Sequence, residues 1–99
     1  MSRILFEISY DVIPEYREDF LTAVRELQKY IKDHADHDYF VVEDRSKPNN
    51  FTEIYVCKDE AEYESLDDGM DETMQVLTSE IASRFIAGGK TRYSTRYEI

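Results

Sequence analysis

The sequence predicts a single α+β domain of ferredoxin-like order, in which strand, helix, strand, strand, helix and strand follow one another. Three patterns indicate this order: apolar residues alternate over 3–10, recur every three or four residues over 14–34, and fill two runs that a turn-forming segment separates. At 99 residues the chain has the size of one domain, and no linker or repeat divides residues 1–99.

The first strand and first helix follow directly from these periods. Residues 3–10 place Leu5, Glu7 and Ser9 on one side and an apolar set on the other, namely Ile4, Phe6, Ile8 and Tyr10. Pro14 suits the first turn of a helix. The apolar stripe of that helix comprises Tyr16, Phe20, Val24, Leu27 and Ile31, and we expect the helix to end near His34.

The second half of the chain repeats the pattern. Strands over 39–43 and 51–57 flank the turn-rich segment 45–50 and form a hairpin. Asp59 and Glu62 resemble a capping box that opens a short helix, which Gly69 closes. A longer helix follows, with Gly88-Gly89 at its end, and then a strand over Thr91 to Ile99. The stripe of the longer helix comprises Met70, Met74, Leu77, Ile81 and Phe85.

This order gives a four-stranded antiparallel sheet with the first and third strands in the centre and the helices on one face. We expect the aliphatic set Ile4, Phe6, Ile8, Ile54 and Val56 on the helix side. The opposite face remains apolar, since Leu5, Phe51, Tyr55 and Cys57 then lie on it. A second copy packed sheet against sheet would cover it, so the sequence predicts a homodimer. The candidates for the dimer face are Leu5, Phe51, Tyr55, Arg92 and Arg96.

The order of elements, the Pro-Glu entry to the first helix, the strand from Phe51 to Cys57 and the segment Asp59-Glu60-Ala61 followed by Leu66 resemble the antibiotic biosynthesis monooxygenase family. The resemblance implies a dimeric α+β barrel. Members of that family include cofactor-independent oxygenases of aromatic polyketides, haem-degrading enzymes and many proteins of unknown role. Many members carry a His near the position of Gly69, which this chain lacks. Haem degradation is set aside because the pocket of that branch uses a Trp and a His, and this chain contains no Trp.

Composition excludes several classes of partner. A formal net charge of -10 opposes binding to nucleic acid and to anionic lipid, and the acidic residues concentrate between 59 and 72 on what we interpret as a solvated face. No apolar run approaches a membrane span, and the first residues lack the pattern of a signal peptide. The lone Cys57 has no partner for an intramolecular disulfide, so we expect a cytoplasmic protein.

Other chemistry is weakly supported. The segment 33–38 contains His34 and His37 among aspartates, but its spacing fits the polar end of a helix better than a metal site. Cys57 fits a small buried residue better than a nucleophile. No axial-ligand pattern or nucleotide fingerprint is present, so we expect no metal, no haem, no flavin and no other cofactor.

The candidate pocket residues are Glu7, Glu53 and Tyr55, which strand parity assigns to the sheet face away from the helices. If these residues form a site, we expect an unpaired carboxylate on that face to act as a general base, because desolvation raises its pKa, and Tyr55 to donate a hydrogen bond to a developing oxyanion. The alternative is structural: Arg92 or Arg96 pairs with Glu7 and sets the register of a dimer. The eight tyrosines of the chain suit either a flat aromatic ligand or an ordinary dimer core.

Two functions therefore remain open. The first is a cofactor-free monooxygenase acting on a small aromatic or polyketide-like molecule, in which the protein assists proton removal so that the substrate itself activates oxygen. The second is a non-catalytic homodimer that binds a small ligand or serves as an interaction module, which the missing His at Gly69 favours.

Overall fold

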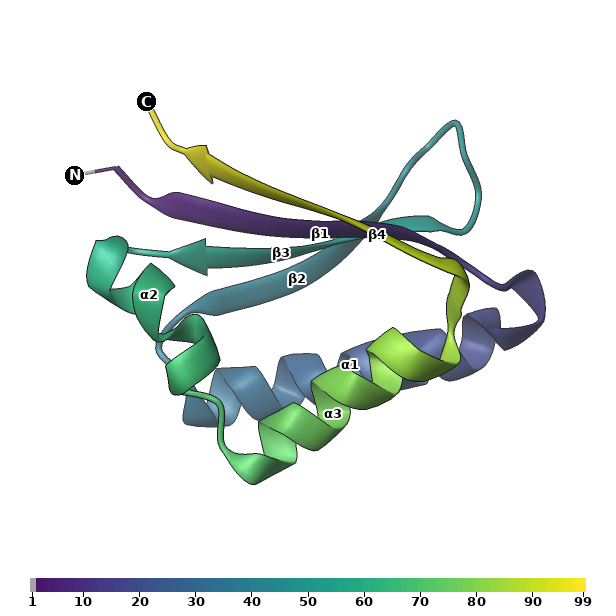
Figure 1. Cartoon of the computed structure of the whole chain (residues 1–99), viewed down its shortest axis with the longest axis horizontal. Helices are drawn as coiled ribbons and strands as arrows, with labels where there is room; N and C mark the ends of the chain where they lie inside the picture. Colours follow the sequence, from purple (N-terminus) through teal and green to yellow (C-terminus); the bar gives the residue numbers. More distant parts are fainter. Residues whose placement is uncertain (1) are drawn as a thin grey trace.

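The computed structural model describes residues 2–99 apart from the side chain of Asp67, which belongs to the acidic segment and lies outside the described residues. The four strands form one antiparallel sheet in the order β2-β3-β1-β4, which confirms the predicted ferredoxin-like fold with the first and third strands in the centre (Figure 1). The elements are β1 (Ile4–Val12), the 3-10 turn η1 (Pro14–Tyr16), α1 (Arg17–His34), β2 (Asp38–Glu43), β3 (Asn50–Cys57), α2 (Glu60–Asp68), α3 (Glu72–Arg84) and β4 (Ile86–Tyr97).

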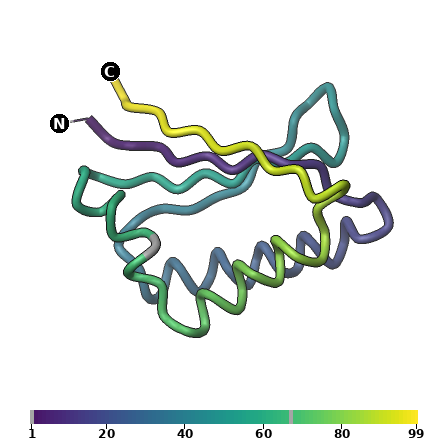
Figure 2. The backbone as a smooth tube through the Cα atoms, viewed as in Figure 1, coloured from purple at the N-terminus to yellow at the C-terminus, as the bar shows by residue number. Residues whose placement is uncertain are grey.

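The molecule has two layers. The helices α1 and α3 run side by side beneath one face of the sheet, whereas α2 stands at the end where the chain begins and finishes (Figure 1). The two ends of the chain lie together (Figure 2). Arg3 and Glu98 join them through a hydrogen-bonded ion pair with a shortest distance of 2.7 Å. Among the described residues, no helix lies on the opposite face of the sheet, as the fold class predicts (Figure 1).

The core fills the space between the sheet and the two long helices. The buried stripe of α1 consists of Phe20, Val24, Leu27 and Ile31. Phe20 lies at its centre, with its ring centroid 4.6 Å from that of Phe51 and 5.9 Å from that of Tyr10. The predicted stripe is therefore confirmed, except that Tyr16 belongs to the preceding turn and is exposed.

Both later helices start with side-chain caps. Asp59 Oδ1 accepts a hydrogen bond from the backbone N–H of Glu62 at 2.9 Å, as the capping pattern predicts. Asp71 Oδ1 does the same for Met74 at 2.8 Å and starts α3. The helical backbone is interrupted between α2 and α3, because the capping residue Asp71 has extended backbone angles.

The prediction that Gly88-Gly89 ends the last helix is wrong. The helix α3 ends at Arg84, and β4 already begins at Ile86, five residues before the predicted start at Thr91. Both glycines lie inside β4 with φ of 67° and 64°, which L-residues rarely adopt. They form a bulge, because β1 pairs through Tyr10 with Thr91 and, only two residues on, through Val12 with Ile86.

The prediction that Ile54 and Val56 of β3 point toward the helices is also wrong. In the β1–β3 register, Tyr55 lies opposite Phe6, Glu53 opposite Ile8 and Phe51 opposite Tyr10. Directly paired residues share a face, so Phe51, Glu53, Tyr55 and Cys57 point toward the helices, and Ile54 and Val56 point away. The helix side takes the aromatic set because Phe51 packs on Phe20 and because the carboxylate of Glu53 finds hydroxyl donors there.

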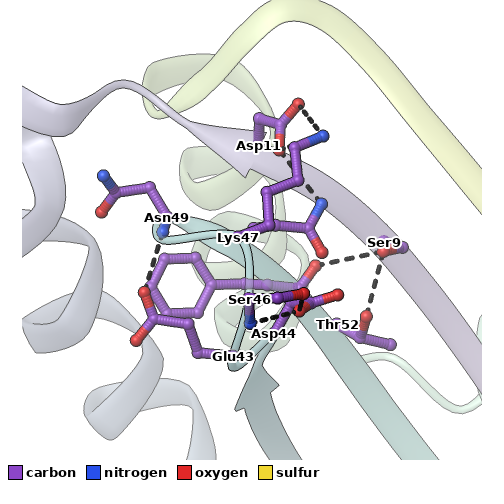
Figure 3. Close-up of polar contacts among 10 residues, drawn as sticks. Ser9, Asp11, Glu43, Asp44, Ser46, Lys47, Asn49 and Thr52 are labelled. Atoms are coloured by element: carbon purple, nitrogen blue, oxygen red, sulfur yellow. Dashed lines mark hydrogen bonds and ion pairs between the residues drawn. The ribbon is translucent and has the colours of Figure 1, made fainter.

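The β2–β3 loop is held by a cluster of polar contacts (Figure 3). The carboxylate of Glu43 accepts a hydrogen bond from the backbone N–H of Asn49 at 2.8 Å. It also accepts hydrogen bonds from the Arg17 guanidinium at 2.5 and 2.8 Å. These bonds lower the pKa of Glu43 to about 2, the Arg17 contact being the larger cause. The loop is thereby tied to the first turn of α1.

Candidate functional site

Among the residues that the structure describes, Glu53 is the one charged side chain in the core, with 5% of its surface exposed. Its Oε2 accepts a hydrogen bond from the Tyr10 hydroxyl and its Oε1 one from the Tyr39 hydroxyl, each at 2.7 Å. The three side chains come from three neighbouring strands, since β3 lies between β1 and β2. A carboxylate with both oxygens engaged in this way has a fixed orientation.

Burial dominates the electrostatics of this cluster. Desolvation raises the pKa of Glu53, and the hydrogen bonds from Tyr39 and Tyr10 oppose that rise without cancelling it. Desolvation, followed by the nearby Glu53 carboxylate, also raises the pKa of Tyr10 and of Tyr39. Both tyrosines therefore keep their protons at neutral pH and act as donors. A carboxylate with a raised pKa is a stronger proton acceptor than an exposed one.

A cavity lies between this carboxylate and α3. It has a volume of about 260 Å³, and its lining includes Glu53, Tyr55, Thr78 and Tyr93. A second cavity of about 270 Å³ adjoins it, since both are lined by Ile8, Tyr55, Thr78 and Tyr93. The lining of the second cavity is otherwise apolar and consists of Phe6, Leu66, Met70 and Met74.

The two cavities together have a polar end and an apolar end. Glu53, Ser79 and Thr91 line the first cavity but not the second, and the apolar side chains of Phe6, Leu66, Met70 and Met74 line the second but not the first. None of the described residues that line either cavity is a Lys or an Arg. Such a site suits a flat, largely apolar molecule that offers a hydrogen-bond donor to a carboxylate.

The bulge in β4 lies at the edge of this site. Ile86 and Thr91, which flank the segment that contains Gly88 and Gly89, both line the first cavity. Tyr93, on the same strand, lines both cavities and has 68% of its surface exposed. The wall toward β4 is therefore the side on which the site meets solvent.

The structure brings together two of the three predicted pocket residues. Glu53 and Tyr55 line one cavity, but on the helix side of the sheet, whereas Glu7 pairs with Ile54 and lies on the other face. There its carboxylate forms an ion pair with Arg96 at 2.9 Å. The predicted arginine partner of Glu7 is thus present within one chain.

The structure places the five dimer-face candidates on two different faces of the sheet. Leu5 pairs with Arg96 and Ser9 with Arg92, so Leu5, Arg92 and Arg96 share the face away from the helices. Phe51 and Tyr55 do not, since both are buried toward the helices. Their assignment to the dimer face is therefore wrong for the same reason of parity.

Sequence reasoning missed Tyr10 and Tyr39 as partners of Glu53. A signal was available in the abundance of tyrosine and in the alternation that puts Tyr10 on the helix side of its strand. The signal could not be used, because Tyr10 and Tyr39 lie 43 and 14 residues from Glu53 in the chain. Only the strand order brings them together.

Cys57 and His34 have structural roles. The thiol of Cys57 is fully buried, which confirms the core interpretation, and burial raises its pKa to about 11. The ring of His34 stacks on that of Tyr30 at 4.2 Å. Within residues 2–99 as described, no three His, Cys, Asp or Glu side chains are grouped so that they could hold a metal ion. In the same part of the chain, no helix combines the length and apolar character of a membrane span.

Comparisons with known proteins support the fold. No protein-family model matches the chain, and no curated protein matches it significantly. Solved structures do match. A conserved protein from Methanosarcina mazei Go1 superposes with a TM-score of 0.83 at 17% identity, over 100% of this chain and 95% of that one.

Two further structures carry a functional description. An antibiotic biosynthesis monooxygenase superposes with a TM-score of 0.74 at 17% identity, over 100% of this chain and 99% of that one. SnoaB, a cofactor-independent oxygenase from Streptomyces nogalater, superposes with a TM-score of 0.72 at 10% identity, over 95% and 90% of the two chains. The chain therefore has the fold of the antibiotic biosynthesis monooxygenases, and at these identities the likeness concerns the fold alone.

Proposed function

We propose that this chain, which shares the fold of the antibiotic biosynthesis monooxygenases, is a cofactor-independent monooxygenase acting on a small aromatic molecule. The observation that carries the proposal is the buried Glu53 carboxylate, which lines a cavity with aromatic walls between the sheet and α3. The similarity to a cofactor-independent oxygenase supports the reaction class.

The proposed reaction converts an activated methylene group and O₂ into a carbonyl group and water. Glu53 removes one proton from the methylene carbon, and the resulting carbanion, delocalised over the aromatic system, transfers electrons to O₂ and forms a carbon-bound peroxide. The proton then returns from Glu53 to the peroxide, and loss of water leaves the carbonyl. Tyr10 and Tyr39 hold the carboxylate in place through their 2.7 Å hydrogen bonds.

The charges around the cavities define the substrate further. Glu53 is the one ionisable carboxylate among the described lining residues, and no Lys or Arg accompanies it. A carboxylate or phosphate on the substrate would be desolvated beside a like charge with no compensating cation. The proposed substrate is therefore an uncharged aromatic molecule with an acidic methylene group.

Anthrone tests the proposal directly, because its methylene carbon is acidified by the ring carbonyl and its oxidation product is anthraquinone. We expect the protein to accelerate O₂ consumption and anthraquinone formation without any added cofactor. The variant Glu53→Gln keeps the shape of the side chain and removes the base, so we expect the rate to fall by about a hundredfold or more. An oxygen electrode and the absorbance of anthraquinone measure both quantities.

The matched control is Glu7→Gln, the same substitution on the neighbouring strand but on the opposite face of the sheet. We expect this variant to keep the rate of the unsubstituted protein. Equal losses in both variants would contradict the assignment of Glu53. Tight binding of anthrone or of 2-naphthol without O₂ consumption would instead favour the second function, a non-catalytic ligand-binding module.

We also infer that the protein works as a homodimer. The sheet face away from the helices carries a contiguous apolar set, because Leu5 pairs with Val56 and Phe40 with Ile54 across neighbouring strands. Phe40 and Val42 have 39% and 44% of their surface exposed. An apolar sheet face of this kind is typical of an interface, and a second copy is the occupant that the proposed barrel requires.

A further inference from the structure

The edge strand β4 carries two exposed tyrosines on the helix side of the sheet. Tyr93 pairs with Ile8 of β1 and Tyr97 with Ile4, and both partners point toward the helices. The exposed fractions of the two tyrosine side chains are similar, at 68% and 60%. Within the described sheet β4 pairs with β1 alone, so no further strand flanks either ring.

Of these two tyrosines, Tyr93 belongs to the site around Glu53. It lines both cavities of that site, whereas Tyr97 is not among the described lining residues of either. The hydroxyl group of Tyr97 instead donates a hydrogen bond to Glu60 at 3.2 Å. The other residues that line both cavities are partly or fully buried, namely Ile8, Tyr55 and Thr78. Tyr93 is therefore the shared wall that a ligand meets first when it enters from solvent.

The ring of Tyr93 is nearly parallel to that of Phe6. Their planes differ by 17°, and their centroids are 6.1 Å apart. Both rings line the second, apolar cavity. A flat ring that stacks on Tyr93 therefore lies parallel to Phe6 as well, whereas a puckered ring of the same size lies flat on neither. Stacked aromatic rings gain free energy beyond that of burying their area.

We propose that Tyr93 is a specificity-determining residue of this site: its ring stacks on the bound molecule and selects flat aromatic compounds over puckered ones of equal size. Because most of the Tyr93 side chain is exposed, its ring can adjust to a ligand without disturbing the core. The inference rests on the proposed function only in treating the two cavities as the substrate site. The proton transfer stays with Glu53.

Two probes with the same carbon skeleton test this selection: 2-naphthol, which is flat and aromatic, and decahydro-2-naphthol, which is saturated and puckered. Each carries one hydroxyl group that can donate to Glu53. Calorimetry in the absence of O₂ gives both affinities. We expect Tyr93→Leu to weaken the binding of 2-naphthol about fivefold, because stacking is lost. We expect the affinity for decahydro-2-naphthol to change by about twofold or less, because leucine keeps an apolar wall.

Two control variants separate stacking from other effects. Tyr93→Phe keeps the ring, so we expect the affinity for 2-naphthol to stay within about twofold of that of the unsubstituted protein. Tyr97→Leu makes the same exchange on the same strand and face at similar exposure, but outside the described lining of both cavities, and should change neither affinity.

Three outcomes would each overturn the role of Tyr93: equal losses for both probes in Tyr93→Leu, an equal loss in Tyr97→Leu, or no saturable binding of 2-naphthol to the unsubstituted protein. Affinities that change as expected in a protein that does not oxidise anthrone would contradict the oxygenase function alone. Oxidation of anthrone by a protein whose affinity for 2-naphthol is the same with tyrosine and with leucine at position 93 would contradict the role of Tyr93 alone.

Discussion

At the scale of single residues, Glu7 and Glu53 show how environment gives two roles to one side chain. Both lie on the central strands, but Glu7 meets the Arg96 guanidinium on the open face, where Arg96 is mostly exposed. Glu53 accepts hydrogen bonds from two tyrosine hydroxyls in the core, and no Lys or Arg in the described part of the chain forms an ion pair with it. An ion pair in contact with water contributes little to stability, whereas a buried carboxylate without a cation costs free energy unless it binds a proton.

This difference predicts how stability depends on pH. Because burial raises the pKa of Glu53 in the folded protein, the folded state holds a proton that the unfolded state loses near pH 4.5. The stability linked to Glu53 is therefore fully present below that pH and is lost as the pH rises toward the raised folded value. Within this window we expect the free energy of unfolding of the unsubstituted protein to fall relative to that of Glu53→Gln by about 1.4 kcal/mol per pH unit.

Urea unfolding of both proteins across pH 4 to 8 measures the difference, and groups common to both cancel. A difference that does not vary with pH would show that Glu53 ionises in the folded state as easily as in the unfolded one. The same comparison on Glu7→Gln serves as the control, since Glu7 lies outside the core.

At the scale of elements, the β2–β3 loop depends on one backbone conformation. Asn49 is the one described residue other than glycine with a positive φ, at 68°. Its backbone N–H donates to Glu43 and its side-chain Oδ1 accepts a hydrogen bond from Arg17 at 2.9 Å. Asparagine tolerates this region better than most residues, so the turn chemistry predicted for 45–50 has its physical basis here.

We predict that Asn49→Gly is more stable than Asn49→Ala by about 1 kcal/mol. Both variants lose the contact with Arg17 and keep the backbone bond to Glu43, but alanine adds a left-handed strain of about 1 to 2 kcal/mol, which the greater unfolded-state entropy of glycine offsets in part. Thermal or urea unfolding measures the order. At Lys47, in the same loop and without a positive φ, we expect the alanine variant to be at least as stable as the glycine variant. The same order at both positions would contradict the role assigned to φ.

At the scale of the whole molecule, the sheet has two covered faces if the dimer forms and one if it does not. The helix face buries the core cluster, and the opposite face leaves Phe40, Val42 and Ile54 without a covering layer in the single chain. The Glu7–Arg96 ion pair lies on the same face and adds polar groups beside the apolar set. Specific interfaces commonly combine an apolar centre with such a polar margin.

We predict that Ile54→Arg converts the protein from a dimer into a folded monomer at micromolar concentration. Ile54 lies at the centre of the open face, between Glu7 on β1 and Phe40 on β2, so an arginine there would place a long charged side chain in the middle of the apolar set and oppose close packing of two sheets. Light scattering gives the mass, and circular dichroism shows whether the monomer keeps its fold. Val76→Arg, on the exposed outer side of α3, is the matched control and should remain dimeric. A monomeric mass for the unsubstituted protein would overturn the barrel arrangement itself.

The amino-acid sequence by itself determined the order of the elements, the two central strands and the buried stripe of α1, because these depend on local periods and on turn and cap residues. The tertiary structure decided which face of β3 meets the helices. Both faces of that strand carry large apolar residues, and the sequence analysis chose the aliphatic face because the other face includes Glu53. The pairing of Tyr55 with Phe6 shows that the aromatic face meets the helices. The tertiary structure also decided the bulge at Gly88-Gly89. It decided the partners of Glu53 as well, because Tyr10 and Tyr39 approach that carboxylate only when three strands align. Contacts between residues far apart in the chain depend on strand register, which is a property of the assembled sheet and not of any one segment.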